Sequence, residues 1–109
     1  MGLTKTEIFT EEQNKIATMA KALGHPARIA ILQFLLSSDR CVTGDLVTEL
    51  GLAQSTISQH LKELKQLGLI QGSIEGTSVC YCLCADVWQD VKNTLGNFIV
   101  EVCQNKACC

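Results

Sequence analysis

Between positions 41 and 70, apolar residues recur at helical spacing in two short segments. In the first segment Thr43 is a candidate N-cap, and Gly51 is a candidate left-handed residue at the end of the helix. The apolar face of this segment consists of Leu46, Val47 and Leu50. The second segment ends at Gly68, and its apolar stripe consists of Ile57, Leu61 and Leu64. Two short amphipathic helices joined by a tight glycine-containing turn are typical of a helix-turn-helix.

The opposite face of the second segment carries short or amide-bearing side chains and a single cation. These residues are Ser55, Ser58, Gln59, Lys62 and Gln66. Such side chains suit hydrogen bonds to base edges and phosphates better than plain solvation, for which Glu–Lys pairs would be expected. An ordinary polar helix surface is the alternative, because helix-turn-helix pairs also occur as packing units. The flanking segments decide between the two interpretations.

Two helices are predicted before this motif and a β-hairpin after it. The first helix spans 6–23, with Thr10 as its possible start, and the second spans 26–36, with Pro26 at its first position after the Gly24-His25 break. After Gly68 the hydrophobic period changes from 3.6 to 2 residues. In the hairpin, the side chains expected to face the core are Val79, Tyr81 and Leu83. Those expected on the opposite face are Cys80, Cys82 and Cys84.

A last helix is predicted from Asp86, as its N-cap, to about Gln104. Its apolar stripe consists of Val87, Val91, Leu95, Phe98 and Val102, with Trp88 and Ile99 beside it. This surface is wider than one small domain can cover. It therefore predicts burial in a homodimer, against the N-terminal helix of either subunit.

Composition and charge set further bounds. The chain has 109 residues, of which 47% are apolar, and this predicts one domain with a substantial core. It has no run of about 18 apolar residues, and its first twelve residues are too polar for a signal peptide, so we expect a cytoplasmic protein without a membrane partner. A net charge of −2 permits a specific DNA-binding protein with a locally basic face. No nucleophile–base pair, phosphate loop or pair of catalytic carboxylates is identifiable, and an enzyme is therefore not expected.

The order of these elements is that of a winged helix, and three stretches carry a more specific resemblance. The stretches ALGHPARIAILQFLL, LVTELGLAQSTISQHLKELKQLGLI and VCYCLC resemble the ArsR/SmtB family of bacterial metal-sensing transcriptional repressors, over about residues 16–103. The fold class expected is mainly α with a small β-hairpin, a homodimeric winged helix-turn-helix. The single domain 1–109 is expected to divide into a dimerisation helix (1–24), the helix-turn-helix (43–68), the wing (69–84), a second dimerisation helix (86–104) and a cysteine-containing tail (105–109).

The resemblance implies that the second helix of the motif enters the major groove of an operator and that inducer binding releases the DNA. The implied DNA-binding residues are Gln54, Ser55, Thr56, Ser58, Gln59 and His60, to which we add Lys62. At its spacing His60 lies beside the Ile57 and Leu64 stripe, so packing or phosphate contact is favoured over base reading. His25, in the helix break, is interpreted as structural. The wing tip 73–77 carries an acidic residue where the family's wings carry Arg or Lys, which weakens the case for phosphate contact there.

Seven cysteines suggest where an inducer binds. The last helix contains no histidine, which argues against the family's helical zinc site, and only Cys41 remains of a three-cysteine arsenic motif at the start of the helix-turn-helix. Cys103, Cys108 and Cys109 place three thiols on a short tether at the C-terminus. Three thiolates without nitrogen or oxygen ligands suit As(III) or Sb(III), with Cd(II) or Zn(II) less favoured. The alternative is that Cys103 is a small helix residue and the pair belongs to a frayed tail.

The other thiols leave further interpretations open. Cys80, Cys82 and Cys84 are either ordinary strand residues or a second thiolate site or redox-reactive patch, and Cys41 is a lone, potentially reactive thiol. The predicted function is a DNA-binding repressor released by a soft thiophilic ion. One alternative is a thiol-redox or persulfide-responsive repressor of the same fold. An alternative from another class is a thiol-based protein that buffers soft metals.

Overall fold

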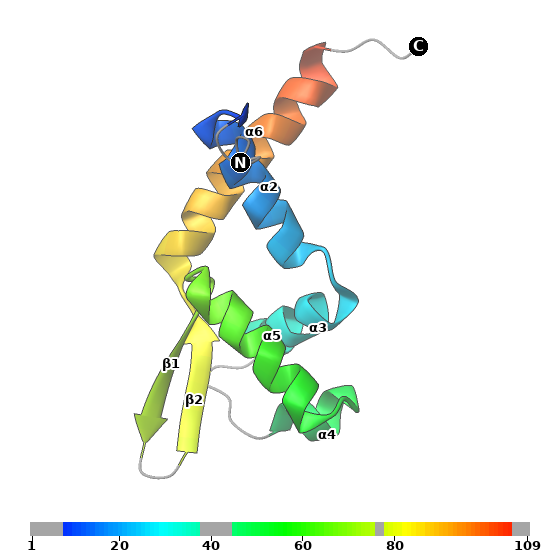
Figure 1. The fold of residues 1–109 in the computed structure, drawn as a ribbon, viewed down its shortest axis with the longest axis vertical. Coiled ribbons are helices and arrows are strands. Elements are labelled where there is room, and N and C mark those ends of the chain that lie inside the picture. Colours follow the sequence, from blue (N-terminus) through cyan, green and yellow to red (C-terminus); the bar gives the residue numbers. More distant parts are fainter. Residues whose placement is uncertain (1–7, 38–44, 76–77, 106–109) are drawn as a thin grey trace, which may run out of the picture.

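The computed structural model describes residues 8–37, 45–75 and 78–105, within which five helices and one β-hairpin are placed (Figure 1). The elements are α2 (Glu11–Leu23), α3 (Pro26–Leu36), α4 (Asp45–Leu50), α5 (Gln54–Gln66), β1 (Ile70–Glu75), β2 (Ser78–Leu83) and α6 (Ala85–Asn105). The two strands pair antiparallel, with Ile70 opposite Leu83 and Glu75 opposite Ser78. This architecture confirms the predicted fold class, a mainly α winged helix-turn-helix with a small hairpin.

The first two described helices begin as their sequences predict. The Thr10 hydroxyl accepts a hydrogen bond from the Gln13 amide at 3.0 Å, and the Gln13 side chain accepts one from the Thr10 amide, which together form a capping box. At α3, the His25 Nδ1 accepts from the Ala27 amide at 3.1 Å, and Pro26 occupies the first helical position. The expected start of the first helix near residue 6 lies outside the described residues.

The turns of the helix-turn-helix also follow the sequence. Gly51 and Gly68 have φ values of 66° and 78°, the left-handed backbone that glycine adopts most readily. The predicted cap Thr43 lies outside the described residues. The prediction that Asp86 is the N-cap of the last helix is wrong, because α6 already begins at Ala85. The Trp88 amide donates to the Cys84 carbonyl at 3.1 Å, so the chain enters the helix earlier and Asp86 lies in the first turn, where its charge still favours the helix dipole.

The core lies where α3 and α5 pack against each other, α4 and the hairpin. Its fully buried side chains are Ile31, Ile57, Leu64 and Ile70. Tyr81 and Leu83 pack against this core, as the period-2 pattern predicts. Cys82 is half-buried, and Cys84 lies beyond the end of β2 rather than within the strand. The side chains of residues 73–80, including Val79 and Cys80, are outside the description.

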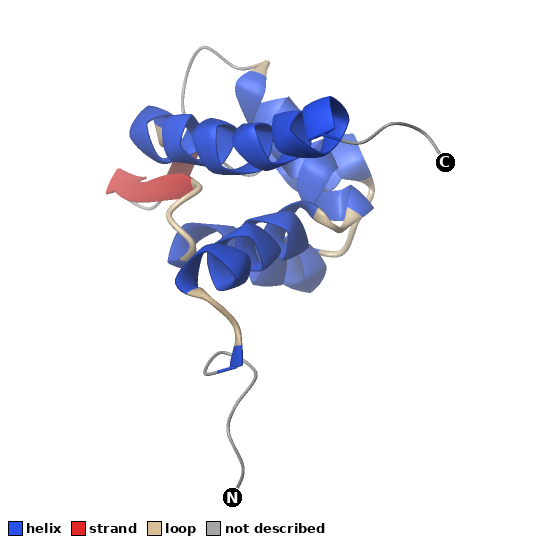
Figure 2. Cartoon of the chain, turned by 90° about the horizontal axis from the view of Figure 1, so that it is seen from above, coloured by secondary structure: helices blue, strands red, loops and turns tan. Residues whose placement is uncertain are grey.

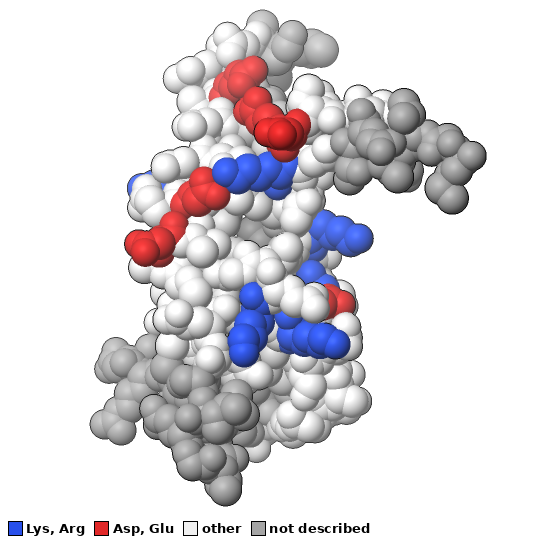
Figure 3. Space-filling model, turned by 60° about the vertical axis from the view of Figure 1, so that its left-hand side comes forward, with Lys and Arg blue, Asp and Glu red and all other residues white. Residues whose placement is uncertain are grey.

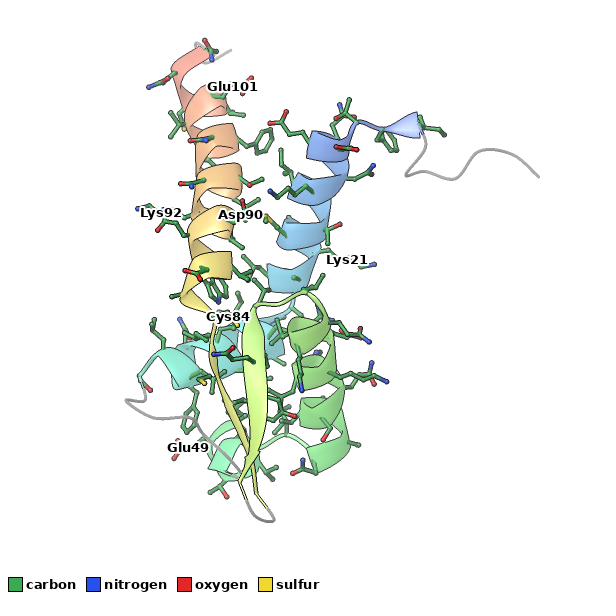
Figure 4. The ribbon with its side chains drawn as sticks, turned by 90° about the vertical axis from the view of Figure 1, so that its left-hand side faces the viewer. Lys21, Glu49, Cys84, Asp90, Lys92 and Glu101 are labelled. Carbon is green, nitrogen blue, oxygen red and sulfur yellow. The ribbon has the colours of Figure 1, made fainter. Side chains whose placement is uncertain are left out.

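Helices α2 and α6 lie side by side above the helix-turn-helix (Figures 1 and 4). The Lys15 ammonium and the Asp90 carboxylate form an ion pair at 3.0 Å between them. The Trp88 indole donates to the Leu69 carbonyl at 2.8 Å and fixes the start of α6 on the hairpin. Seen from above, the hairpin lies at one side of the helices (Figure 2). Within the described residues, no helix has the length and apolarity needed to cross a membrane.

Candidate DNA-binding surface

Helix α5 has two distinct faces. Its buried face consists of Ile57, His60, Leu61 and Leu64. Six of the seven predicted DNA-binding residues are exposed on the rest of the helix: Gln54, Ser55, Thr56, Ser58, Gln59 and Lys62. The apolar stripe holds α5 against the body of the domain and leaves these polar side chains in solvent. His60 is the exception.

Two hydrogen bonds connect side chains along the surface of α5. The Gln54 side-chain amide donates to the Ser58 hydroxyl at 3.0 Å, and that of Gln59 donates to the Glu63 carboxylate at 3.0 Å. The helix begins after Ala53, whose side chain has no group that can cap it. The first-turn N–H groups therefore remain available at the positive end of the helix dipole, where phosphates bind readily.

His60 is placed inside the domain rather than on this surface. Only 9% of the residue is exposed, and its Nδ1 accepts a hydrogen bond from the Arg28 Nε at 3.2 Å. Its ring centroid lies 4.5 Å from that of His25. Burial, helped by the nearby His25 and Arg28, lowers the pKa of His60 below its ordinary 6.5. This placement agrees with the interpretation of His60 as a packed histidine.

Arg28 and Glu63 were not singled out from the sequence. Arg28 of α3 donates a hydrogen bond to His60 and forms an ion pair with Glu63 of α5. The spacing of Glu63 three residues after His60 places them on neighbouring positions of one helix. Nothing local in the sequence indicates that Arg28, 32 residues before His60, reaches the same point.

Positive charge is concentrated near α5. Lys62 and Lys65 are exposed on α5, and Lys21 is exposed in the last turn of α2, which ends above α5 (Figure 4). On the face shown in Figure 3, most acidic side chains lie over the upper half, whereas Lys and Arg predominate lower on the molecule. The wing sequence 69–84 contains no Lys or Arg. Among the described residues, the positive charge available to DNA therefore lies on the helices rather than on the wing.

Comparison with known proteins identifies the family. Residues 25–71 match the model of the bacterial regulatory protein, arsR family. The HTH-type transcriptional regulator YgaV of Escherichia coli is 32% identical over 106 residues, which cover 97% of this chain and 99% of YgaV. The chain belongs to the ArsR family of transcriptional regulators. Members of this family are DNA-binding regulators, which confirms the prediction that the chain is not an enzyme.

Two further relatives extend the comparison. The uncharacterized HTH-type transcriptional regulator Rv0081 of Mycobacterium tuberculosis is 38% identical over 69 residues; this match spans 63% of the chain and only 60% of Rv0081. The structure of HlyU from Vibrio cholerae superimposes with a TM-score of 0.65 at 31% identity, covering 88% of this chain and all of HlyU. The ArsR-family fold therefore extends over most of the described residues.

Two of the cysteines that the structure describes lie at opposite ends of α6. Cys103 is exposed near the end of α6, whereas Cys84 precedes the start of that helix (Figure 4). At 1.5 Å per residue the two lie about 28 Å apart along α6, too far for one site in one subunit. Within the described part of the chain, no three His, Cys, Asp or Glu side chains are grouped to hold a metal ion. Cys41, Cys108 and Cys109 lie outside that part, so the predicted tail site stays a prediction.

Proposed function

We propose that this ArsR-family regulator represses transcription as a homodimer on double-stranded operator DNA, with α5 in the major groove. The observation that carries the proposal is the exposed face of α5, where Gln54, Ser58 and Gln59 offer amide and hydroxyl groups beside Lys62. Glutamine and serine side chains bind base edges, and lysine binds phosphates. A two-fold dimer presents two copies of α5 to half-sites about 34 Å apart.

Binding of a labelled duplex from upstream of its own gene tests this function. We expect saturable binding that weakens steeply as salt increases, because lysine–phosphate contacts release counterions. We also expect tighter binding to this duplex than to a shuffled duplex of the same composition. Equal affinity for the two duplexes would contradict operator recognition. Absence of binding at low salt would favour the thiol-based metal-buffering alternative.

The homodimer is supported by apolar surface at the far end of the molecule. In the C-terminal half of α6 the exposed large apolar side chains are Phe98, Ile99, Val100 and Val102, with exposures of 46–58%. Ile8 and Phe9, before α2, are also exposed, at 61% and 50%. Several large apolar side chains exposed near one another are typical of an interface, and a second copy of the chain offers the same surface in a two-fold arrangement.

Phe98→Glu is expected to convert the dimer into a monomer without unfolding it. Phe98 is half exposed in the single chain, so the fold does not depend on its burial, whereas an interface would bury the new charge at high cost. Sedimentation velocity gives the mass, and circular dichroism gives the helix content. Gln89→Glu, the same charge change on the exposed N-terminal half of α6, is the control and should stay dimeric. A monomeric wild type, or a dimeric Phe98→Glu variant, would contradict this interface.

For the inducer, we propose that Cys103, Cys108 and Cys109 bind As(III) or Sb(III). Cys103 is exposed and lies at the same end of α6 as the apolar surface. Capture of an ion there shifts α6 in the dimer, which changes the spacing of the two α5 helices. A coupling of about 1–3 kcal/mol, or about 5- to 150-fold in DNA affinity, is typical of such linkage.

Cys103→Ser is expected to bind DNA like the wild type but to lose release by arsenite. A serine hydroxyl has the size of the thiol but is a poor ligand for a soft ion. Cys84→Ser is the matched control, since it changes a thiol at the opposite end of α6 and should leave release intact. DNA binding of both reduced variants is titrated with arsenite, antimonite, cadmium and zinc.

The outcomes separate the remaining alternatives. Release of Cys103→Ser by arsenite would exclude Cys103 as a ligand. Release of the wild type by polysulfide or peroxide, but not by arsenite under reducing conditions, would identify a thiol-redox repressor. Release by cadmium or zinc alone would indicate that the inducer binds at a site with a different ligand set.

A further inference from the structure

One guanidinium joins three helices beneath the DNA-binding face. Arg28 of α3 donates from Nε to His60 Nδ1 at 3.2 Å and from Nη1 to the Ala22 carbonyl of α2 at 3.4 Å. Its Nη2 forms an ion pair with Glu63 of α5. Its side chain is only 15% exposed, so these contacts are largely shielded from water. The Arg28–His60 hydrogen bond is therefore one of the polar contacts that place α5 on α3, together with the Arg28–Glu63 ion pair.

This hydrogen bond fixes the protonation of His60. An arginine side chain has no acceptor and stays charged, so Nδ1 of His60 must be unprotonated and the ring proton must lie on Nε2. A second proton on the ring would occupy Nδ1, remove the acceptor and place a positive charge against the guanidinium. The His25 ring, 4.5 Å away, accepts the Ala27 amide at its own Nδ1 and cannot relieve that charge.

We propose that the Arg28–His60 hydrogen bond is an acid-sensitive contact that holds α5 in its DNA-binding position. Protonation of His60 loosens α5 from α3, and operator affinity falls as the pH decreases. The inference rests on DNA binding through α5 and is independent of the inducer. It assigns to Arg28 and His60 a positioning role rather than a contact with DNA.

The charged groups around His60 support this direction. From α3 it is faced by His25 and Arg28, and Glu63 on its own helix is already engaged by Arg28. Lys21 of α2 lines the same cleft as Arg28 and Glu63 and adds another positive charge, while Glu49 of α4 is exposed. Among the described side chains no unengaged carboxylate is placed to stabilise an imidazolium at His60.

The sign of the pH effect follows from the lowered pKa of His60. Because the folded protein binds this proton less readily than the unfolded chain, the stabilisation by neutral His60 is complete above about pH 6.5. It is lost as the pH falls through the lowered pKa. A histidine that contacts phosphate behaves in the opposite way, since its protonation adds a positive charge at the DNA and tightens binding.

The test measures DNA affinity between pH 5.5 and 7.5 at constant ionic strength. The reduced full chain is titrated into a rhodamine-labelled duplex from upstream of its own gene, and fluorescence anisotropy gives Kd. The chain has two histidines, so His60→Asn and His25→Asn together account for all histidine titration. Asparagine at 60 keeps an acceptor oxygen near the position of Nδ1 and cannot be protonated. Asparagine at 25 keeps a helix-capping oxygen.

We expect the wild type and His25→Asn to lose at least about fivefold in affinity on acidification, and His60→Asn to change less than about twofold. If His60→Asn does not fold, His60→Gln takes its place. The proton NMR titration of the two imidazoles in the DNA-free protein gives a second readout, in which His60 titrates below 6.5. Tighter binding at low pH, an unchanged loss in the His60 variant, or a His60 midpoint at or above 6.5 would overturn the inference.

DNA binding without a pH-dependent loss overturns this inference alone. Absence of DNA binding at every pH overturns the repressor function together with it. The two failures are therefore distinguishable in one set of titrations.

Discussion

Gln54→Glu is expected to weaken operator binding of the dimer at least about 30-fold, about 2 kcal/mol, because base contacts contribute about 1–3 kcal/mol each and the dimer presents two copies. Gln54 is the first residue of α5, exposed, at the end of the helix that enters the groove. The substitution replaces an amide donor by a negative charge next to phosphates. It leaves the fold intact, since a carboxylate in the first turn favours the helix dipole and can accept a hydrogen bond from the Ser58 hydroxyl in place of the one that the Gln54 amide donates.

Gln54→Glu is expected to lower the affinity for DNA without lowering the stability of the protein, so that a lost DNA contact is distinguished from unfolding. Thermal unfolding should show Gln54→Glu to be at least as stable as the wild type, while anisotropy shows the loss of affinity. Gln89→Glu, on α6, has the same size and charge change and is expected to keep wild-type affinity. Equal losses in both variants would assign the effect to net charge rather than to contact by α5.

Leu64→Ala is expected to lower the free energy of unfolding by about 2–5 kcal/mol, the range for truncating a fully buried leucine. Leu64 has no exposed surface and lies on the buried face of α5, in the core cluster with Ile31 and Ile57. Removal of its side chain leaves a cavity beneath the DNA-binding helix. Urea unfolding at one fixed protein concentration measures the loss, because the stability of a dimer depends on concentration.

The neighbouring Lys65→Ala provides the control. Lys65 is exposed, and surface substitutions usually change stability by no more than about 0.5 kcal/mol. A loss for Leu64→Ala below about 1 kcal/mol would mean that the packing of α5 against α3 is not as the structure places it.

The two ends of the molecule carry different surfaces. The lower end carries the polar face of α5 above a core of Ile57, Leu61 and Leu64. The upper end carries the exposed apolar side chains of α6, with Cys103 among them. Helix α6 connects the two, because Trp88 at its start is hydrogen-bonded to Leu69 next to the end of α5. The Trp88–Leu69 hydrogen bond thus connects α6 to the residues that follow the C-terminal end of α5.

The sequence determined the elements of this fold and most of the exposed polar face of α5. Thr10, Pro26, Gly51 and Gly68 act through backbone geometry within a few residues, so their caps and turns are readable locally. The polar face of α5 is readable because one helix turn relates each residue to its neighbours. The start of α6 was misplaced because the choice between Cys84 and Asp86 depends on how the hairpin delivers the chain to the helix.

Only the tertiary structure decided the role of His60 and its partners. The sequence placed His60 at the border between the apolar stripe and the polar face, where a small rotation of the helix exposes or buries it. Packing of α3 against α5 settled that rotation and brought Arg28 to the imidazole from 32 residues away. Periodicity records which residues share a face of one helix. The partner of a buried polar side chain depends on the meeting of two helices, and the sequence pattern of neither helix specifies it.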